Sequence, residues 1–163
     1  MTDQDSKLHV PPRGTRGARL IDIFGRLGKP FARREVARLQ KIAGPEPGKF
    51  MGFPVVVLTT IGAKSGQERN CVLGGFPDGE DAWLLIASKG GSATHPAWFH
   101  NIARNPDKVW VQVGNRKFQA RCESLTGKER DDAYARVANV APQYAGYPKK
   151  TDREIPVLRI TPA

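Results

Sequence analysis

The stretch FPVVVLTTIGAKSGQERN, residues 53–70, joins two patterns that together decide the fold. Its first half is a run of β-branched residues, which is typical of a buried strand and predicts one over residues 54–60. Its second half places small and charged residues within eight positions: Gly62, Lys64, Ser65, Gly66 and Arg69. Backbone amides, a hydroxyl and two cations there can converge on an anion. The glycine spacing excludes a Walker loop, and an ordinary polar hairpin is the alternative.

Further strands follow this stretch. NCVLGGF and AWLLIAS flank PDGED, where Asp78 and Gly79 favour a tight turn, so residues 70–76 and 82–88 are predicted to be antiparallel neighbours. KVWVQV and KFQARCESL flank GNR in the same way and predict a second hairpin. EIPVLRIT predicts a closing strand. Strands joined mostly by hairpins favour a small antiparallel barrel or curled sheet.

Helices are predicted at three places. Thr126 and Glu129 form a capping-box pattern that predicts a helix through about Asn139. Pro96 is expected in the first turn of another helix, and Trp98 and Asn101 are then expected on one face of it. A core position is the alternative for Trp98. The third helical region lies before residue 50.

That front region is basic and amphipathic. The chain has 26 Lys and Arg against 16 Asp and Glu, a net charge of +10, and residues 1–50 hold 11 basic and 5 acidic side chains. Apolar residues recur there at helical spacing: Leu20, Ile23, Phe24, Leu27 and Phe31. Pro30 is expected to kink this helix or to start a second one. The stripe suits a helix docked on the core, with peripheral contact with an anionic membrane as the alternative. Nucleic acid is not expected, because no RNP-like strand, zinc finger or GXXG loop accompanies the charge.

Other classes of protein are excluded by what the sequence lacks. It has no apolar run of spanning length and no signal peptide, so we expect a cytoplasmic protein. Cys71 and Cys122 lack CxxC spacing and are expected as free thiols. His95 and His100 are predicted on different helix faces, and no metal site is expected. We expect a flexible tail over residues 1–15 and a single domain over residues 16–163 that includes the basic segment.

A turn rich in glycine lies between a predicted strand and the helix at Trp98. In IASKGG, residues 86–91, the strand ends at Ser88, Lys89, Gly90 and Gly91. Missing side chains let a flat ligand approach the backbone, whose amides can bond its carbonyls. The unpaired amides at the start of the following helix point to the same place. This arrangement suits the edge of a flavin-like ring.

These motifs resemble the deazaflavin-dependent nitroreductases, the A-type F420H2-dependent oxidoreductases, which have a split β-barrel fold, mainly β with helices. The resemblance covers residues 18–161 and rests on FPVVVLTTIGAKSGQERN, IASKGG, HPAWFHNIARNP and QYAGYPKKTDREIPVLRI, in that order. It implies reduced coenzyme F420 as cofactor and hydride transfer to a small organic acceptor: a quinone, an enone or a nitroaromatic. It leaves open a monomer or a homodimer.

The resemblance also implies roles for individual residues. The phosphate and acidic tail of the cofactor fall to the loop at Lys64, Ser65, Gly66 and Arg69. The deazaflavin is bordered by Ala87, Ser88, Lys89 and Gly90, with Trp98 and Asn101 beside it. Tyr144 and Tyr147, with Trp98, are expected to line the acceptor pocket. The proton can come from Tyr144, Ser88, Lys89 or water.

Some positions depart from the family pattern and affect the acceptor. Small residues stand where the family often has larger ones: Ala63, Gly74, Ala97 and Ala141. The sequence therefore predicts a roomier pocket and does not imply reduction of bulky nitroimidazoles. Three alternative functions stay open at this point: a non-catalytic F420 carrier, an FMN-dependent oxidoreductase on the same barrel, and a basic RNA-binding barrel.

Overall fold

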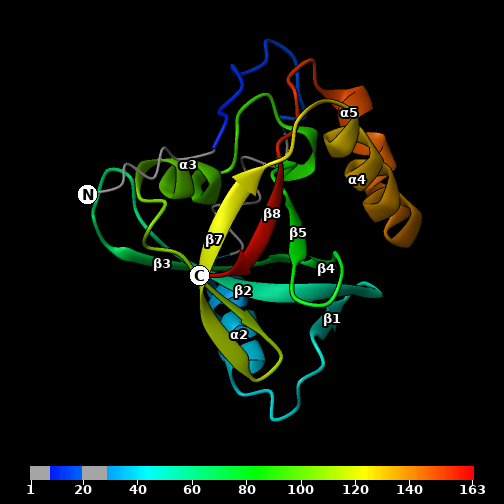
Figure 1. Ribbon diagram of the computed structural model, residues 1–163. Helices are drawn as coiled ribbons and strands as arrows, with labels where there is room; N and C mark the ends of the chain where they lie inside the picture. The colour runs from blue at the N-terminus through cyan, green and yellow to red at the C-terminus, as the bar shows by residue number, and fades with distance from the viewer. Residues whose placement is uncertain (1–7, 20–28) are drawn as a thin grey trace.

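The computed structural model describes residues 8–19 and 29–163 (Figure 1). The strands are β1 (Gly48–Phe50), β2 (Phe53–Ile61), β3 (Glu68–Gly74), β4 (Phe76–Pro77), β5 (Trp83–Ile86), β6 (Trp110–Val113), β7 (Arg116–Ser124) and β8 (Val157–Pro162). The helices are α2 (Lys29–Gln40), η1 (Lys89–Gly91), α3 (Ala97–Arg104), α4 (Gly127–Val140), η2 (Pro142–Gly146) and α5 (Tyr147–Lys150). Within these residues no helix combines the length and the apolar character needed to cross a bilayer.

The strands form one curled antiparallel sheet in the order β1-β2-β6-β7-β8-β5-β4, and β3 pairs with the other edge of β2. β7 is long enough to serve both halves: residues 116–119 pair with β6 and residues 120–124 pair with β8. In Figure 1 this strand runs from the hairpin beside α2 to the opposite end of the molecule. The predicted split barrel, mainly β with helices, is confirmed.

Both faces of β2 are buried, which explains its uninterrupted apolar run. Val55 and Val57 join one core cluster, whereas Val56 and Leu58 join a second cluster on the opposite face. Each of these four side chains is at most 3% exposed. Because side chains alternate across a strand, a two-sided position requires apolar residues at every place rather than at every second place.

Each core cluster has its own helices. Val36 and Leu39 of α2, and Tyr134 and Val137 of α4, belong to the cluster that contains Val55. Phe99 and Ile102 of α3 belong to the other cluster, and both are 0% exposed. In Figure 1, α3 and α4 lie on opposite sides of β7 and β8, and α2 lies below β2. Of the apolar stripe that was expected to dock on the core, the described member is Phe31, and it is 59% exposed. Residues 20–28 lie outside the described part.

The predicted pairing of residues 70–76 with residues 82–88 is largely wrong. β3 pairs with β2 along its whole length, and only Phe76 and Pro77 pair with β5. The break falls at Gly75, whose amide donates to the Pro54 carbonyl at 3.1 Å. A Cβ at this glycine would lie 2.4 Å from Val56 Cγ1, so the chain can approach β2 there only without a side chain.

Helix α4 begins as predicted but without the expected capping bonds. Thr126 is the N-cap residue, yet its hydroxyl makes no capping hydrogen bond. Glu129 instead accepts a hydrogen bond from Arg159 Nη1 at 2.8 Å, and Arg159 Nε also donates to Asp78 at 2.7 Å. The glutamate therefore ties the helix to β8 rather than to its own first turn. Pro30 lies at the start of α2, one of the two places expected for it.

The segment before α2 contacts residues far along the chain. The Gly14 amide donates to the Ala93 carbonyl at 2.8 Å, and the Ala18 amide donates to the Gly91 carbonyl at 2.9 Å. Asp152 accepts hydrogen bonds from the amides of residues 15 and 16, each at 2.9 Å. Residues 8–15 are thus hydrogen-bonded where the sequence suggests a flexible tail. The division of the chain into a tail and one domain stays a prediction.

Candidate functional site

Two cavities adjoin where β3, the turn after β5 and helix α3 come together. The larger is an open cleft of about 1100 Å³, and the smaller is a pocket of about 420 Å³. Cys71, Lys89 and Trp98 line both. A molecule in the cleft and a molecule in the pocket can therefore meet across these three side chains.

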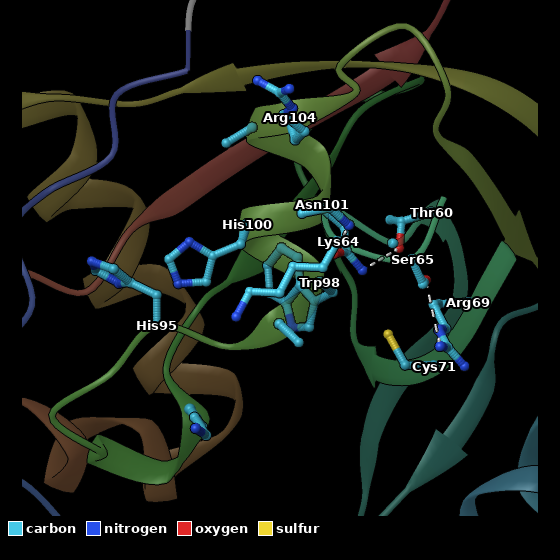
Figure 2. A pocket seen from close by; sticks show the side chains of 15 residues that line it. Thr60, Lys64, Ser65, Arg69, Cys71, His95, Trp98, His100, Asn101 and Arg104 are labelled. Carbon is cyan, nitrogen blue, oxygen red and sulfur yellow. Dashed lines mark hydrogen bonds between the residues drawn. The ribbon is translucent and has the colours of Figure 1, made fainter. Parts of the chain in front are cut away.

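The cleft is cationic. It is lined by Lys64 and Arg69 of the loop, Lys89 of the turn, and His100 and Arg104 of α3. None of the described residues that line it is Asp or Glu. Figure 2 shows His100 and Arg104 along the helix and Arg69 on the strand across the cleft. An elongated anion would meet positive charge along its length.

The loop between β2 and β3 is a closed turn. The Gly62 amide donates to the Gln67 carbonyl at 2.8 Å, and the Gly66 amide donates to the Gly62 carbonyl at 2.9 Å. Gly66 has φ +68°, a left-handed conformation that favours glycine. Lys64, Ser65 and Arg69 are exposed around this turn. Ser65 Oγ accepts hydrogen bonds from the Gln67 amide at 3.2 Å and from Arg69 Nη2 at 3.5 Å, which holds these groups together at the exposed edge of the cleft.

Asn101 holds this loop against α3. Its Oδ1 accepts a hydrogen bond from the Ala63 amide at 2.9 Å, and its Nδ2 donates to Thr60 Oγ1 at 3.1 Å. The residue is 8% exposed. The family resemblance implies that it lies beside the deazaflavin. In the structure both ends of its amide bond the protein, so its evident task is to position the loop.

The turn after β5 has an unusual backbone. Three successive residues have positive φ: Lys89 at 43°, Gly90 at 60° and Gly91 at 85°. A lysine in this region is uncommon and persists where its surroundings require it. Its Nζ donates to Thr94 Oγ1 at 3.0 Å. The backbone thus fixes Lys89 at the border of the two cavities.

A buried arginine holds that turn in place. Arg153 is 6% exposed, and its guanidinium donates to the carbonyls of Ala87, Ser88 and Ser92 at distances from 2.7 to 3.1 Å. Burial lowers the pKa of Arg153 to about 10, which leaves it charged at neutral pH. It lies within the quoted QYAGYPKKTDREIPVLRI motif, but sequence reasoning gave it no role. An isolated arginine before a predicted strand is usually expected to lie at the protein surface.

His95 links the arginine to the N-terminal segment. Its Nδ1 lies 3.1 Å from Arg153 Nη1, and its Nε2 lies 2.7 Å from the Pro11 carbonyl. Because the arginine can only donate, Nδ1 accepts and the proton of the neutral ring is assigned to Nε2. The prediction that His95 and His100 face apart is wrong. His95 precedes α3, and the two ring centroids are 5.8 Å apart.

The smaller pocket is mostly apolar and aromatic. Tyr144 lines it and packs edge-on against Phe53 and Phe76, with centroids 6.1 and 5.5 Å away. A Cβ at Gly74 would lie 2.7 Å from the Tyr144 hydroxyl, so the small residue makes room for that group. Burial, followed by the neighbouring Tyr147, raises the pKa of Tyr144 and keeps its proton on at neutral pH.

The structure gathers most of the predicted site residues but not all. Six line the cleft: Lys64, Ser65, Arg69, Lys89, Trp98 and Asn101. Four line the pocket: Ser88, Lys89, Trp98 and Tyr144. The remaining four line neither cavity: Gly66, Ala87, Gly90 and Tyr147. Tyr147 instead packs against the ring of Tyr144, with centroids 5.1 Å apart.

Several lining residues were not assigned to the site from the sequence. Thr60, Cys71 and Arg104 line the cleft, and Phe31 and Glu35 of α2 line the pocket. Among them, Arg104 could have been predicted, because it lies one turn beyond His100 on a predicted helix. The α2 residues come from the basic amphipathic segment, for which a docked helix was predicted but no place in a ligand pocket.

Comparison with known proteins agrees with this geometry. Residues 31–162 match the family described as F420H(2)-dependent quinone reductase. The chain is 39% identical over 113 residues to an F420H(2)-dependent quinone reductase of Mycobacterium tuberculosis, which covers 66% of this chain and 73% of that protein. It is similar to a solved F420-H2 dependent reductase (FDR-A), with TM-score 0.59, 38% identity and coverage of 66% and 93% of the two chains. A solved domain-swapped dimer has TM-score 0.61, 32% identity and coverage of 81% and 98%.

The position of His95 predicts a pH dependence of stability. Burial lowers its pKa, and Arg153 and His100 add smaller effects in the same direction against the Pro11 hydrogen bond. The imidazole of His95 therefore binds its second proton more tightly in the unfolded chain than in the folded protein. The contribution of neutral His95 to the free energy of unfolding is complete above about pH 6.5 and is lost as the pH falls below that value. Urea unfolding at pH 7.5 and 5.5 should show a smaller loss for His95→Gln than for the wild type. Equal losses would contradict the assignment.

Proposed function

The chain belongs to the F420H(2)-dependent quinone reductase family, and on that premise we propose that it is an oxidoreductase that uses reduced coenzyme F420 to reduce quinone-type acceptors. The observation that carries the proposal is a cationic cleft that opens onto an apolar pocket across Cys71, Lys89 and Trp98. F420 carries a phosphodiester and a string of glutamates, and a quinone is a flat apolar ring. The two cavities suit these two molecules in charge and polarity.

The residues of the cleft fit the cofactor. Lys64, Ser65 and Arg69 present two cations and a hydroxyl on a closed turn, which suits a phosphate. Asn101 of α3 holds that turn in place through its hydrogen bonds to Ala63 and Thr60. Arg104 lies further along the cleft, where a longer acidic tail would extend. Each charge-assisted hydrogen bond of this kind contributes about 1.5 to 3 kcal/mol.

The turn at Ser88 and Lys89 brings the reacting partners together. When bound, the reduced deazaflavin supplies the hydride. The chain's own part is to hold a ring edge against the left-handed turn, with Trp98 between the cavities. The apolar walls of the pocket, from Phe53 to Tyr144, shield the inner part of the acceptor from water.

Tyr144 is our first choice for the group that donates a hydrogen bond to the reacting carbonyl on the acceptor side. Its hydroxyl lies in the pocket wall beside Gly74. Because its pKa is raised, the group stays protonated and can donate a hydrogen bond to a carbonyl oxygen that gains negative charge. Lys89 and Ser88, which also line the pocket, are the other candidates.

Membrane contact is a finer proposal for the same protein. The exposed apolar side chains Phe31 and Phe50 line the apolar pocket at its outer side, and Met51, which follows Phe50, is 78% exposed. Arg33 and Lys49 are exposed beside them in the sequence. An apolar rim with cations suits the surface of an anionic bilayer, from which a lipid-borne quinone could enter.

The first prediction concerns the loop. Lys64→Ala and Arg69→Ala should each weaken F420 binding by about 1.5 to 3 kcal/mol without unfolding the protein, because each removes one charge-assisted contact. Isothermal titration with F420 measures this. Lys117→Ala, an exposed lysine on β7 away from the cleft, is the matched control and should bind as the wild type does. Full affinity in both loop variants would remove the loop from the site.

The second prediction concerns Tyr144. Tyr144→Phe keeps the ring packed against Phe53 and Phe76 but removes the hydroxyl, so turnover with a quinone should fall by about 10- to 100-fold while F420 affinity is unchanged. Steady-state kinetics and a cofactor titration together test it. Loss of F420 affinity in this variant would instead place Tyr144 on the cofactor side.

The third prediction concerns the apolar rim. The double variant Phe31→Ser, Met51→Asn should bind anionic vesicles more weakly than the wild type at low salt, because it removes two exposed apolar side chains. Co-sedimentation at low and high salt measures this. Val140→Ser, at an apolar position on α4 that is as exposed as Phe31, is the control. Wild-type protein that stays in the supernatant at low salt would refute membrane contact.

A further inference from the structure

One carboxylate projects into the wall of the acceptor pocket. Glu35 lies on α2, one turn after Phe31, and both residues line the pocket. Its side chain is 20% exposed and accepts a hydrogen bond from Arg38 Nη2 at 2.9 Å. The arginine side chain is 52% exposed and is not among the lining residues of the pocket. The pair therefore turns its negative member toward the pocket and its positive member toward water.

The charges of the two cavities differ in kind. Among the described lining residues of both cavities, Glu35 is the single acidic side chain. Among the described residues that line the pocket, Lys89 is the single lysine or arginine, and it lies at the border with the cleft. An acidic molecule is thus attracted at every charged position of the cleft, whereas inside the pocket it meets the Glu35 carboxylate.

We propose that Glu35 is a specificity-determining residue that makes the pocket select neutral quinones over acidic ones. The proposal rests on the proposed function, since it names the acceptor class of that same site. Among apolar walls a charge is screened less than in water, so a carboxylate there disfavours a second anion. The same repulsion keeps the acidic part of the cofactor on the cleft side. Without it, a basic protein of net charge +10 would attract anionic acceptors generally.

The test compares two naphthoquinones of similar ring size, menadione and 1,4-naphthoquinone-2-sulfonate. In Glu35→Gln, kcat/KM for the sulfonate should rise by about fivefold, and kcat/KM for menadione should change by less than about twofold. Equilibrium dialysis of each quinone against the protein without F420H2 gives a second readout, in which the sulfonate should also bind more tightly to the variant. High salt should reduce the difference.

Two further variants control for the charge change. Arg38→Gln removes the partner that neutralises Glu35, so it should lower kcat/KM for the sulfonate, the opposite direction. Glu46→Gln removes an exposed carboxylate of the loop before β1, which lines neither cavity, and should change neither quinone. Together they separate a local effect from an effect of net charge.

The outcomes distinguish this inference from the proposed function. Turnover of menadione by the wild type with an unchanged sulfonate ratio in Glu35→Gln overturns the role of Glu35 and leaves the quinone reductase intact. Equal changes for both quinones also overturn it, because a charge-selective residue must discriminate between them. Absence of turnover with any quinone refutes the proposed function, and the dialysis result still decides whether Glu35 discriminates by charge.

Discussion

The hydrogen bonds of the buried Arg153 guanidinium to the carbonyls of Ala87, Ser88 and Ser92 are the constraint on which the site depends. A buried cation without partners is costly, and here the carbonyls of one turn and the ring of His95 replace water around it. The same bonds hold the backbone through the left-handed residues that follow Ser88. One side chain therefore fixes the turn, orients His95 and, through it, bonds the N-terminal segment at Pro11.

A second consequence is the division of the site into two chemically different spaces. The turn, held from beneath, carries Lys89 to the border of the cleft and the pocket, where Trp98 and Cys71 also lie. On one side the charged residues are cationic, and on the other the walls are apolar with one carboxylate. Hydride transfer needs two rings in close contact, but the two molecules can otherwise lie in surroundings of different polarity. A border made of few side chains meets both needs.

How much of the site could be predicted depended on distance along the chain. The loop from Gly62 to Arg69 and the turn from Ser88 to Gly91 were visible because each is a compact run of residues with one local property. Arg153, His95 and Glu35 were missed as site residues, because each acts on a segment far from it in sequence. Asn101 was predicted as a site residue beside the cofactor, but in the structure its side-chain amide hydrogen-bonds Ala63 and Thr60. The ring contact of His95 and His100 was missed because the helix begins after His95.

By itself the sequence determined six of the eight strands and their order, the second hairpin and the family motifs, because strand periodicity, turn residues and glycine spacing are local properties. The short strands β1 and β4 were not predicted. It did not determine which strands pair. Residues 70–74 pair with β2 rather than with β5 because Gly75 lets the chain approach Val56, a contact that no local pattern encodes. The tertiary structure alone decided that α2, predicted from its pattern as part of a helical segment docked on the core, supplies Phe31 and Glu35 to the acceptor pocket. The physical reason is that the packing of α2 against strands distant in sequence decides which of its side chains line the cavity. The pattern of the helix alone does not decide this.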